Sequence, residues 1–251
     1  MEQKLISLRK FNLLMALLHF GQGVAMLILS SNFSLPVTTS YLKFDAATQS
    51  LVPNTQILFN LKIGPGVAAF LFISALAHLS ISTVFNKWYN EKLAQGINPA
   101  RWIEYAFSSS IMIVVISMLV GIYDISALIP IFFVNAAMIL FGWMMELHNQ
   151  STTRANWTSF IFGCIAGIAP WIVIALYLAS PGSTANPPTF VYWIFFSIFI
   201  FFNCFAINQV LQYKKVGKWQ DYLYGERVYI ILSLVAKSLL AWQVFAGTLR
   251  P

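Results

Sequence analysis

The sequence predicts an all-α membrane protein, a bundle of seven transmembrane helices. Of its 251 residues, 59% are hydrophobic and only 9% are charged, whereas about a quarter of the residues of a soluble domain carry a charge. The apolar residues also fall into seven runs of about twenty, the length that crosses about 30 Å of hydrocarbon. Because no hydrophilic stretch is long enough to fold separately, we expect residues 1–251 to form a single domain.

Each run is bounded by polar residues or by Pro and Gly. The first run is interpreted as a retained helix rather than a cleaved signal peptide, because it is about twenty residues long and lacks a small-residue cleavage site. The third and fourth are separated only by "YDIS", which predicts a tight turn. The expected spans are Phe11–Ser30, Gly64–Phe85, Trp102–Tyr123, Ala127–Glu146, Ser159–Ala179, Phe190–Leu211 and Val228–Leu249.

The longest connection, residues 31–63, contains two β-prone stretches, "PVTTSYLKF" and "SLVPNTQILF", joined by "DAATQ". This pattern predicts a β-hairpin outside the membrane. A loop of this length often has a role, such as covering a ligand core or making a subunit contact, although a merely solvated loop fits equally well.

The basic residues are distributed unevenly between the two ends of the expected bundle. Short cytoplasmic loops are enriched in Lys and Arg, and an odd number of spans puts the termini on opposite sides. We therefore expect a multi-pass protein of the cell membrane with its N-terminus in the cytoplasm and its C-terminus outside. This orientation explains the net charge of +7 better than nucleic-acid binding does, and we expect no nucleic-acid partner. Eleven basic residues lie on the N-terminal side, namely Lys4, Arg9, Lys10, Lys87, Lys92, Arg101, Arg154, Lys214, Lys215, Lys218 and Arg227, against Lys43, Lys62 and Arg250 on the other.

Few ionisable residues fall inside the spans, and Lys237 is the deepest cation. It lies about nine residues into the last span, roughly 14 Å deep at 1.5 Å per residue, and its stem of about 6 Å is too short to reach the membrane surface. A charge in the bilayer core costs roughly 3 kcal/mol even on the milder insertion scale. Glu104 is the only carboxylate properly inside a span, since Asp124 and Glu146 mark helix ends. We therefore predict an ion pair between Lys237 and Glu104.

Two interpretations of this pair stay open. It could be a structural salt bridge between the third and seventh spans, or the amine could be a nucleophile. A desolvated lysine condenses with an aldehyde to form a Schiff base, and the protonated Schiff base then needs the same counter-ion. Seven spans, a mid-membrane lysine in the last and a carboxylate in the third are together typical of a retinal-binding architecture.

Other polar residues fall at helical spacing around the predicted pair. Arg101, Glu104, Tyr105 and Ser108 share one helix face, and Ser233 lies one turn before Lys237. These groups could hydrogen-bond the pair or enclose water, although ordinary helix packing also explains Ser108.

Two histidines and two small polar residues lie at a depth similar to that of the lysine. His19 and His78 could exchange the proton of Lys237, or each could be a neutral, hydrogen-bonded group. Ser74 and Asn135 add polarity at this level and are typical of interhelical packing as well as of a site. The two cysteines, Cys164 and Cys204, lie in apolar runs and are interpreted as buried hydrophobes.

The segments "RWIEYAFSSSIMIV", "FFVNAAMILFGW", "FGCIAGIAPWI" and "LSLVAKSLLAWQVFAGTL" closely resemble heliorhodopsins, and the resemblance covers essentially the whole chain. It implies a rhodopsin-like bundle with all-trans retinal bound to Lys237 as a protonated Schiff base, Glu104 as its counter-ion and Ser233 close by. It places His19 and His78 near a hydrated cavity on the cytoplasmic side. The family also implies an inverted orientation and homodimers in which the first exterior loop takes part, and no enzymatic activity is expected.

The resemblance also implies a mechanism, by contrast with proton-pumping rhodopsins. Such pumps carry an aspartate four residues before the lysine and usually a second carboxylate about three turns beyond the counter-ion, where this chain has Ser233 and Val115. We therefore predict a photosensor with a slow photocycle and no ion transport. The alternatives are a light-driven pump or channel, and a transporter or receptor without a chromophore. The basic segment "YKKVGKWQDYLYGER" is a place where an unidentified cytoplasmic signalling partner could bind, or only a membrane anchor.

The lining of the expected retinal pocket is less well defined by the sequence. Aromatic and small residues on the fourth to sixth spans suit a polyene and its ring, and we expect Met138, Gly142, Gly167 and Phe202 to contribute. In a chain with 22 Phe and 8 Trp, each could equally be plain packing.

Overall fold

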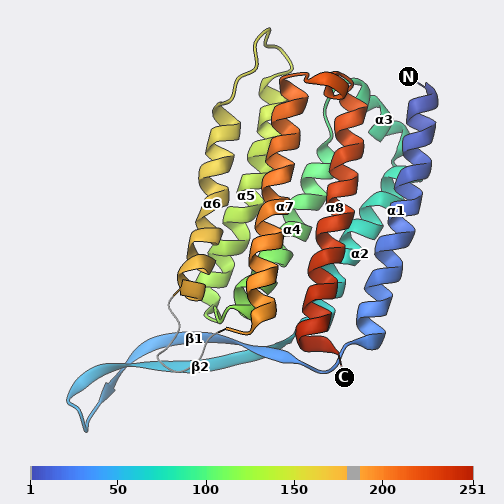
Figure 1. Ribbon diagram of the computed structural model, residues 1–251. Helices are drawn as coiled ribbons and strands as arrows, with labels where there is room; N and C mark the ends of the chain where they lie inside the picture. Colours follow the sequence, from blue (N-terminus) through green and yellow to red (C-terminus); the bar gives the residue numbers. More distant parts are fainter. Residues whose placement is uncertain (1, 180–186, 251) are drawn as a thin grey trace.

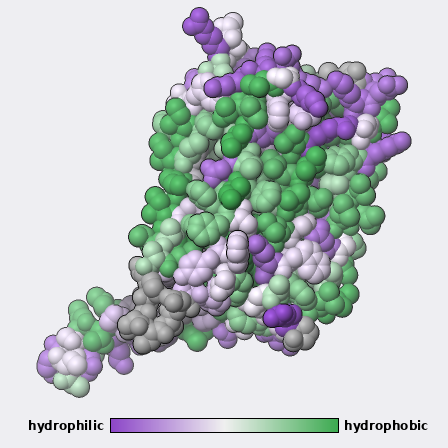
Figure 2. All heavy atoms as spheres, viewed as in Figure 1, coloured by the Kyte–Doolittle hydropathy of each residue, from purple (hydrophilic) through white to green (hydrophobic). Residues whose placement is uncertain are grey.

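Seven long apolar helices form the bundle, as predicted (Figure 1). The structure is a computed structural model that describes residues 2–179 and 187–250. On the face shown in Figure 2, hydrophobic residues cover the middle of the bundle, and hydrophilic residues gather at the end where α1 begins. The spanning helices are α1 (Glu2–Leu29), α2 (Ile63–Ser82), α4 (Pro99–Leu119), α5 (Ile125–His148), α6 (Thr158–Ala179), α7 (Thr189–Tyr213) and α8 (Tyr222–Val244), the last continued by a π-helical turn, Phe245–Leu249.

The first and last helices begin earlier than the apolar runs predict, because a helix does not have to end where the hydrocarbon ends. Helix α1 begins at Glu2 rather than Phe11, and α8 begins at Tyr222 rather than Val228. Their polar first turns pair with each other, since Lys4 Nζ lies 2.7 Å from Asp221 Oδ2. Lys237 is therefore about 22 Å from the start of α8 at 1.5 Å per residue, because the first turns of the helix precede the predicted apolar run.

A short helix, α3 (Asn86–Ala94), was not predicted. Its sequence "NKWYNEKLA" is too polar and too short for a span, but it buries Tyr89 and Leu93 against Leu8 of α1 and Leu223 of α8. This burial raises the pKa of the Tyr89 hydroxyl above its usual range, so the group stays protonated. Helix α3 thus covers the end of the bundle at which α1 begins, which we call the amino end.

Helix α4 starts directly after this cover. Asn98 Oδ1 accepts a hydrogen bond from the backbone N–H of Arg101 at 3.1 Å, a typical N-cap. Pro99 occupies the first helical turn, where a missing N–H has no cost. These two residues set where Arg101 and Glu104 enter the bundle.

The predicted β-hairpin is present and consists of β1 (Ser34–Asp45) and β2 (Ser50–Lys62), paired antiparallel. It crosses the end of the bundle opposite to the amino end and extends well beyond the helices (Figure 1). The Thr38 backbone N–H donates to the Tyr123 carbonyl at 2.9 Å, next to an irregularity in the strand register at Val37. This contact fastens the hairpin to the α4–α5 turn.

The two halves of the bundle differ in polarity. The hairpin half is filled by large apolar side chains, among them Phe70, Leu71, Ile116 and Val244, each with no exposed surface. The buried charged residues Arg101, Glu104, Glu146, Glu226 and Lys237 all lie between the middle of the bundle and the amino end. The polar half is therefore where a functional site is expected.

Candidate functional site

The buried ion pair between Lys237 and Glu104 is present, as predicted. Lys237 lies in the middle of α8 and is 3% exposed, and its Nζ is 2.7 Å from Glu104 Oε1 on α4. The same amine donates to Ser233 Oγ, one turn earlier on α8, at 2.8 Å. Both acceptors are held by rigid helices, so the amine is fixed in the interior.

The Glu104 carboxylate has a second donor that the sequence analysis treated as packing. Ser74 Oγ on α2 donates to Glu104 Oε1 at 2.6 Å, so α2, α4 and α8 meet at this carboxylate. Ser108 is fully buried one turn along α4, and its hydroxyl makes no hydrogen bond within the described residues. A buried hydroxyl without a partner is a place for a water or a ligand atom.

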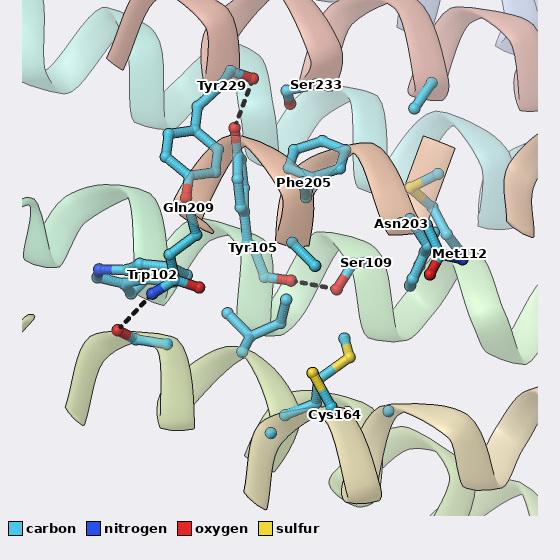
Figure 3. A pocket seen from close by; sticks show the side chains of 18 of the residues that line it. Trp102, Tyr105, Ser109, Met112, Cys164, Asn203, Phe205, Gln209, Tyr229 and Ser233 are labelled. Atoms are coloured by element: carbon cyan, nitrogen blue, oxygen red, sulfur yellow. Dashed lines mark hydrogen bonds between the residues drawn. The ribbon is translucent and has the colours of Figure 1, made fainter. Parts of the chain in front are cut away.

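An apolar cavity of about 410 Å³ begins at Lys237 and is lined by α4, α5, α6, α7 and α8. Its volume lies in the usual range of small-molecule sites, about 300–1,000 Å³. The predicted lining residues Met138, Gly142, Gly167 and Phe202 all contribute, as do Ser233 and Tyr105 (Figure 3). The cavity therefore offers one reactive amine and otherwise mainly hydrocarbon and aromatic surface.

The two glycines in the lining make room for neighbouring side chains. A Cβ at Gly142 would collide with the Trp102 ring, and one at Gly167 would collide with the Met138 side chain. Larger residues at these positions would push Trp102 or Met138 into the cavity. The width of the cavity thus depends on both glycines.

Much of the aromatic lining was missed by the sequence analysis. At the end of the cavity nearer the hairpin, Trp171 packs edge to face against Phe195, Phe199 and Phe202, with ring centroids 5.2–5.6 Å apart. On α4, Trp102, Ser109 and Met112 lie on the same face as Tyr105, at spacings of three and four residues that could have been extended from the predicted face. For Phe199 and Phe205 on α7 the sequence held no such signal, because apolar residues surround that helix on all sides.

A long apolar ligand that carries an aldehyde fits this arrangement. The cavity extends along neighbouring helices and its walls are mainly apolar. The Lys237 amine in its lining is paired with the Glu104 carboxylate. Retinal has these properties. Lys237 would hold it covalently, while Met138, Trp171 and Phe202 are placed to contact its apolar part.

The two predicted histidines lie together but do not bond to the ion pair. His19 and His78 stack with ring centroids 5.7 Å apart and planes 8° from parallel. His78 Nδ1 is 2.8 Å from Asn12 Oδ1, and neither nitrogen of His19 has a partner among the described residues. His78 and Glu104 both line a second, small cavity of about 30 Å³, which has room for about one water molecule.

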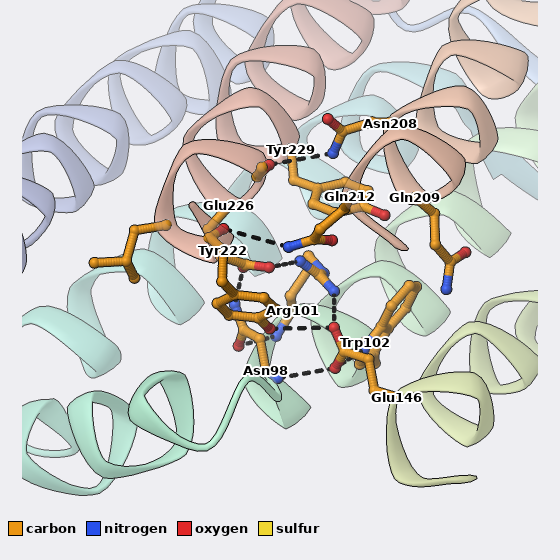
Figure 4. A network of polar contacts seen from close by, with 12 residues as sticks. Asn98, Arg101, Trp102, Glu146, Asn208, Gln209, Gln212, Tyr222, Glu226 and Tyr229 are labelled. Atoms are coloured by element: carbon orange, nitrogen blue, oxygen red, sulfur yellow. Dashed lines mark hydrogen bonds and ion pairs between the residues drawn. The ribbon is translucent and has the colours of Figure 1, made fainter. Parts of the chain in front are cut away.

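The prediction that Arg101 hydrogen-bonds the ion pair was wrong, although Arg101 does line the small cavity beside Glu104. It shares a face with Glu104, but its guanidinium turns toward the amino end and bonds Glu146 on α5, at 2.6 Å, and Glu226 on α8 (Figure 4). It also lies over the Tyr229 ring, 3.9 Å from the centroid. The sequence analysis placed Glu146 at the end of a span and not in the interior, but its side chain is buried and only 1% exposed. Arg101 therefore belongs to a second charged cluster, not to the Lys237 pair.

Asn135 was predicted in the site and lies outside the cavity lining. Its amide donates to Ser109 Oγ at 2.8 Å and to Ser110 Oγ at 3.0 Å, which joins α5 to α4 behind the cavity wall. A polar residue at the depth of the lysine can face another helix instead of the cavity, and sequence depth alone does not separate these cases.

Seven spanning helices, a buried lysine in the last and a carboxylate paired to it from the third span define the class of the rhodopsins. A sequence model described as Heliorhodopsin matches residues 8–249, and the chain belongs to the heliorhodopsin family. Membership implies a retinal chromophore and a light-sensing role.

Solved structures agree on the fold. A crystal structure of the transmembrane domain and linker region of Salpingoeca rosetta rhodopsin phosphodiesterase superposes with a TM-score of 0.58 at 10% identity, over 97% of this chain and 73% of that one. At that identity the likeness concerns the fold alone. A search of curated protein sequences finds no match.

Proposed function

We propose that this protein is a light sensor in which Lys237 carries all-trans retinal as a protonated Schiff base, with Glu104 as its counter-ion. One observation carries the proposal, namely the Lys237 amine, which opens onto an apolar cavity of about 410 Å³ and is paired with Glu104 at 2.7 Å. The retinal, when bound, supplies a polyene that absorbs visible light and isomerises. The whole chain acts as a single domain and has no enzymatic activity of its own.

The chain's own residues hold the proton at Lys237 Nζ. Glu104 balances its charge, Ser233 accepts one of its hydrogen bonds, and Ser74 keeps Glu104 in place. When light changes the geometry at Nζ, the proton moves into the polar region that contains His78 and His19. Because these groups are buried and have few partners, the proton returns slowly, which gives a slow photocycle.

Ion transport is not part of the proposed function. Proton pumping uses relays of ionisable groups through the membrane. In the described parts of the spanning helices, no Asp, Glu, Lys or Arg lies between Lys237 and the hairpin end. Large apolar side chains such as Ile113 and Ile116 fill that half instead. A light-driven pump or channel is therefore the weaker alternative.

The amino end is the proposed cytoplasmic side, because it carries eleven of the fifteen basic residues and the hairpin end only three. The polar region around Lys237 then faces the cytoplasm. The exposed basic residues Lys214, Lys215 and Lys218, between α7 and α8, are where a cytoplasmic signalling partner would sense the photocycle.

Two copies are proposed to form a homodimer through the hairpin. The part of the hairpin that extends beyond the bundle carries exposed apolar side chains, including Leu42, Phe44 and Leu51, each more than half exposed. Exposed apolar strands of this kind are covered in stable proteins by a partner surface.

Reconstitution with retinal tests the proposal. All-trans retinal added to the purified apoprotein should produce a visible absorption band, and Lys237→Ala should abolish it. Borohydride reduction should fix retinal to the wild-type chain as a mass adduct. A band that persists in Lys237→Ala would refute the covalent site, and a sustained light-driven current in vesicles would refute the absence of transport.

A further inference from the structure

Tyr105 is the only residue of the described chain that lines both the apolar cavity and the small polar one. The apolar cavity extends from Lys237 along α5, α6 and α7. The polar cavity is lined by Asn12, His78, Glu104 and Glu226. The Tyr105 ring therefore stands as a wall between a region suited to hydrocarbon and a region suited to water.

The ring is fixed at both of its ends. The Tyr105 hydroxyl donates to the Tyr229 backbone carbonyl at 2.9 Å (Figure 3). The Tyr105 ring also packs edge to face with the Phe205 ring, with centroids 5.4 Å apart. The residue is 7% exposed. A hydrogen bond to the α8 backbone and an aromatic neighbour hold the Tyr105 ring between the two cavities.

Lys237 lies at this wall. Its Nζ is 5.0 Å from the centroid of the Tyr105 ring and bonds Glu104 on the polar side. The polar cavity has room for about one water molecule, and the buried Asn12 Nδ2 there has no partner within the described residues. A water that passed the wall would meet the carbon bonded to Nζ.

We propose that Tyr105 is a positioning residue that keeps water of the polar cavity away from the bond between retinal and Lys237. Hydrolysis of that bond adds water to the imine carbon, forms the aldehyde C=O, breaks the C–N bond and returns the free amine. The inference rests on the proposed function and assigns Tyr105 a role beyond contact with the polyene.

The test is the rate at which the visible band is lost in the dark when hydroxylamine is added to the retinal-loaded protein. Tyr105→Phe keeps the ring and removes only the hydroxyl, so its rate should stay within about threefold of wild type. Tyr105→Ala and Tyr105→Leu remove the ring, and their bands should be lost at least about tenfold faster, a factor that corresponds to about 1.4 kcal/mol in the barrier.

Ile81→Ala is the matched control. Ile81 lines only the polar cavity, so the variant enlarges that cavity and leaves the wall intact, and its rate should match wild type. Tyr105→Leu provides the test even where Tyr105→Ala folds poorly. A wild-type rate in Tyr105→Leu, or an equal acceleration in Ile81→Ala, would overturn the role of Tyr105. Failure of the wild type itself to form a band overturns the proposed function instead.

Discussion

The two buried charged groups of this protein differ in what surrounds them. At Lys237, an amine with three donors has two acceptors, Glu104 and Ser233, and faces a cavity. At Arg101, the guanidinium bonds two carboxylates and is stacked by Trp102 and Tyr229. The first group has room for chemistry, whereas the second is closed by its neighbours.

The carboxylates show the same contrast. Glu146 accepts four hydrogen bonds, from Arg101, Tyr222, Trp102 and the Asn98 backbone. Three of these donors are N–H groups, and the four bonds occupy both carboxyl oxygens of Glu146. Glu104 accepts from Lys237 and Ser74 through the same oxygen. A cluster with one guanidinium between two carboxylates joins α4, α5 and α8, while the Lys237 pair faces a large cavity and can exchange partners and protons.

The largest effect is expected at the closed cluster. Arg101→Met leaves Glu146 and Glu226 buried without a cation, which should lower the free energy of unfolding by about 3–5 kcal/mol. Thermal unfolding of the apoprotein in detergent measures this. Arg227→Met is the control, since its guanidinium bonds the Ser7 hydroxyl at the exposed surface, and surface substitutions usually change stability by about 0.5 kcal/mol or less. Equal losses in the two variants would show that the cluster is not the stabilising element described here.

The next effect distinguishes the Lys237 pair from the Arg101 cluster by the wavelength of the visible absorption band. Glu104→Gln removes the carboxylate beside the Schiff-base nitrogen. This carboxylate stabilises the ground state more than the excited state, because the positive charge moves away from the nitrogen on excitation. Two charges about 4 Å apart interact by about 4 kcal/mol at an effective dielectric constant of 20, so the band should move clearly to longer wavelength. Glu146→Gln is the isosteric control in the closed cluster and should leave the wavelength nearly unchanged. Equal wavelength shifts in Glu104→Gln and Glu146→Gln would mean that the band position does not depend on the Lys237 pair in particular.

The sequence predicted the open region well and the closed one poorly, for a physical reason. Lys237 and Glu104 stand out because they are charges in the middle of apolar runs, where only pairing makes them tolerable. Glu226 lies in a stretch that has the composition of a basic loop, and Glu146 lies at the end of an apolar run. Their burial depends on α3 and on the early start of α8, which are tertiary features that hydropathy does not contain.

The cavity lining shows a second limit of the sequence. Gly142 and Gly167 could be predicted as candidates because small residues leave room for a polyene, although small residues are also common where membrane helices pack. Trp171, Phe199 and Phe205 could not be selected, because 22 Phe and 8 Trp give every helix candidates. Only the packing of α6 against α7 decides which rings face inward.

A smaller effect is expected at Ser233. Ser233→Ala removes an acceptor from the Lys237 amine, and hydrogen bonds to charged groups contribute about 1.5–3 kcal/mol. The loss should appear in the thermal stability of the apoprotein and as a minor shift of the visible band. Ser117→Ala is the matched control, because the buried Ser117 hydroxyl bonds only the neutral Ile113 carbonyl. A loss in Ser117→Ala as large as that in Ser233→Ala would contradict a special role for the charge at Lys237.

The smallest effect is expected at Asp124, a solvent-exposed carboxylate at the start of α5. Its Oδ1 accepts the Ser126 hydroxyl at 2.6 Å and the Ser126 backbone N–H at 2.8 Å, and these bonds hold the pKa of Asp124 below its usual range. A lowered pKa stabilises the fold above the unfolded pKa of about 3.9, and this contribution is lost as the pH falls through the lower folded value. Asp124→Asn keeps an N-cap oxygen without the charge, so the wild type should lose its advantage over this variant on acidification from pH 7 to pH 3. An advantage that stays constant over that range, measured by thermal unfolding of both proteins, would show that the carboxylate charge does not stabilise the cap.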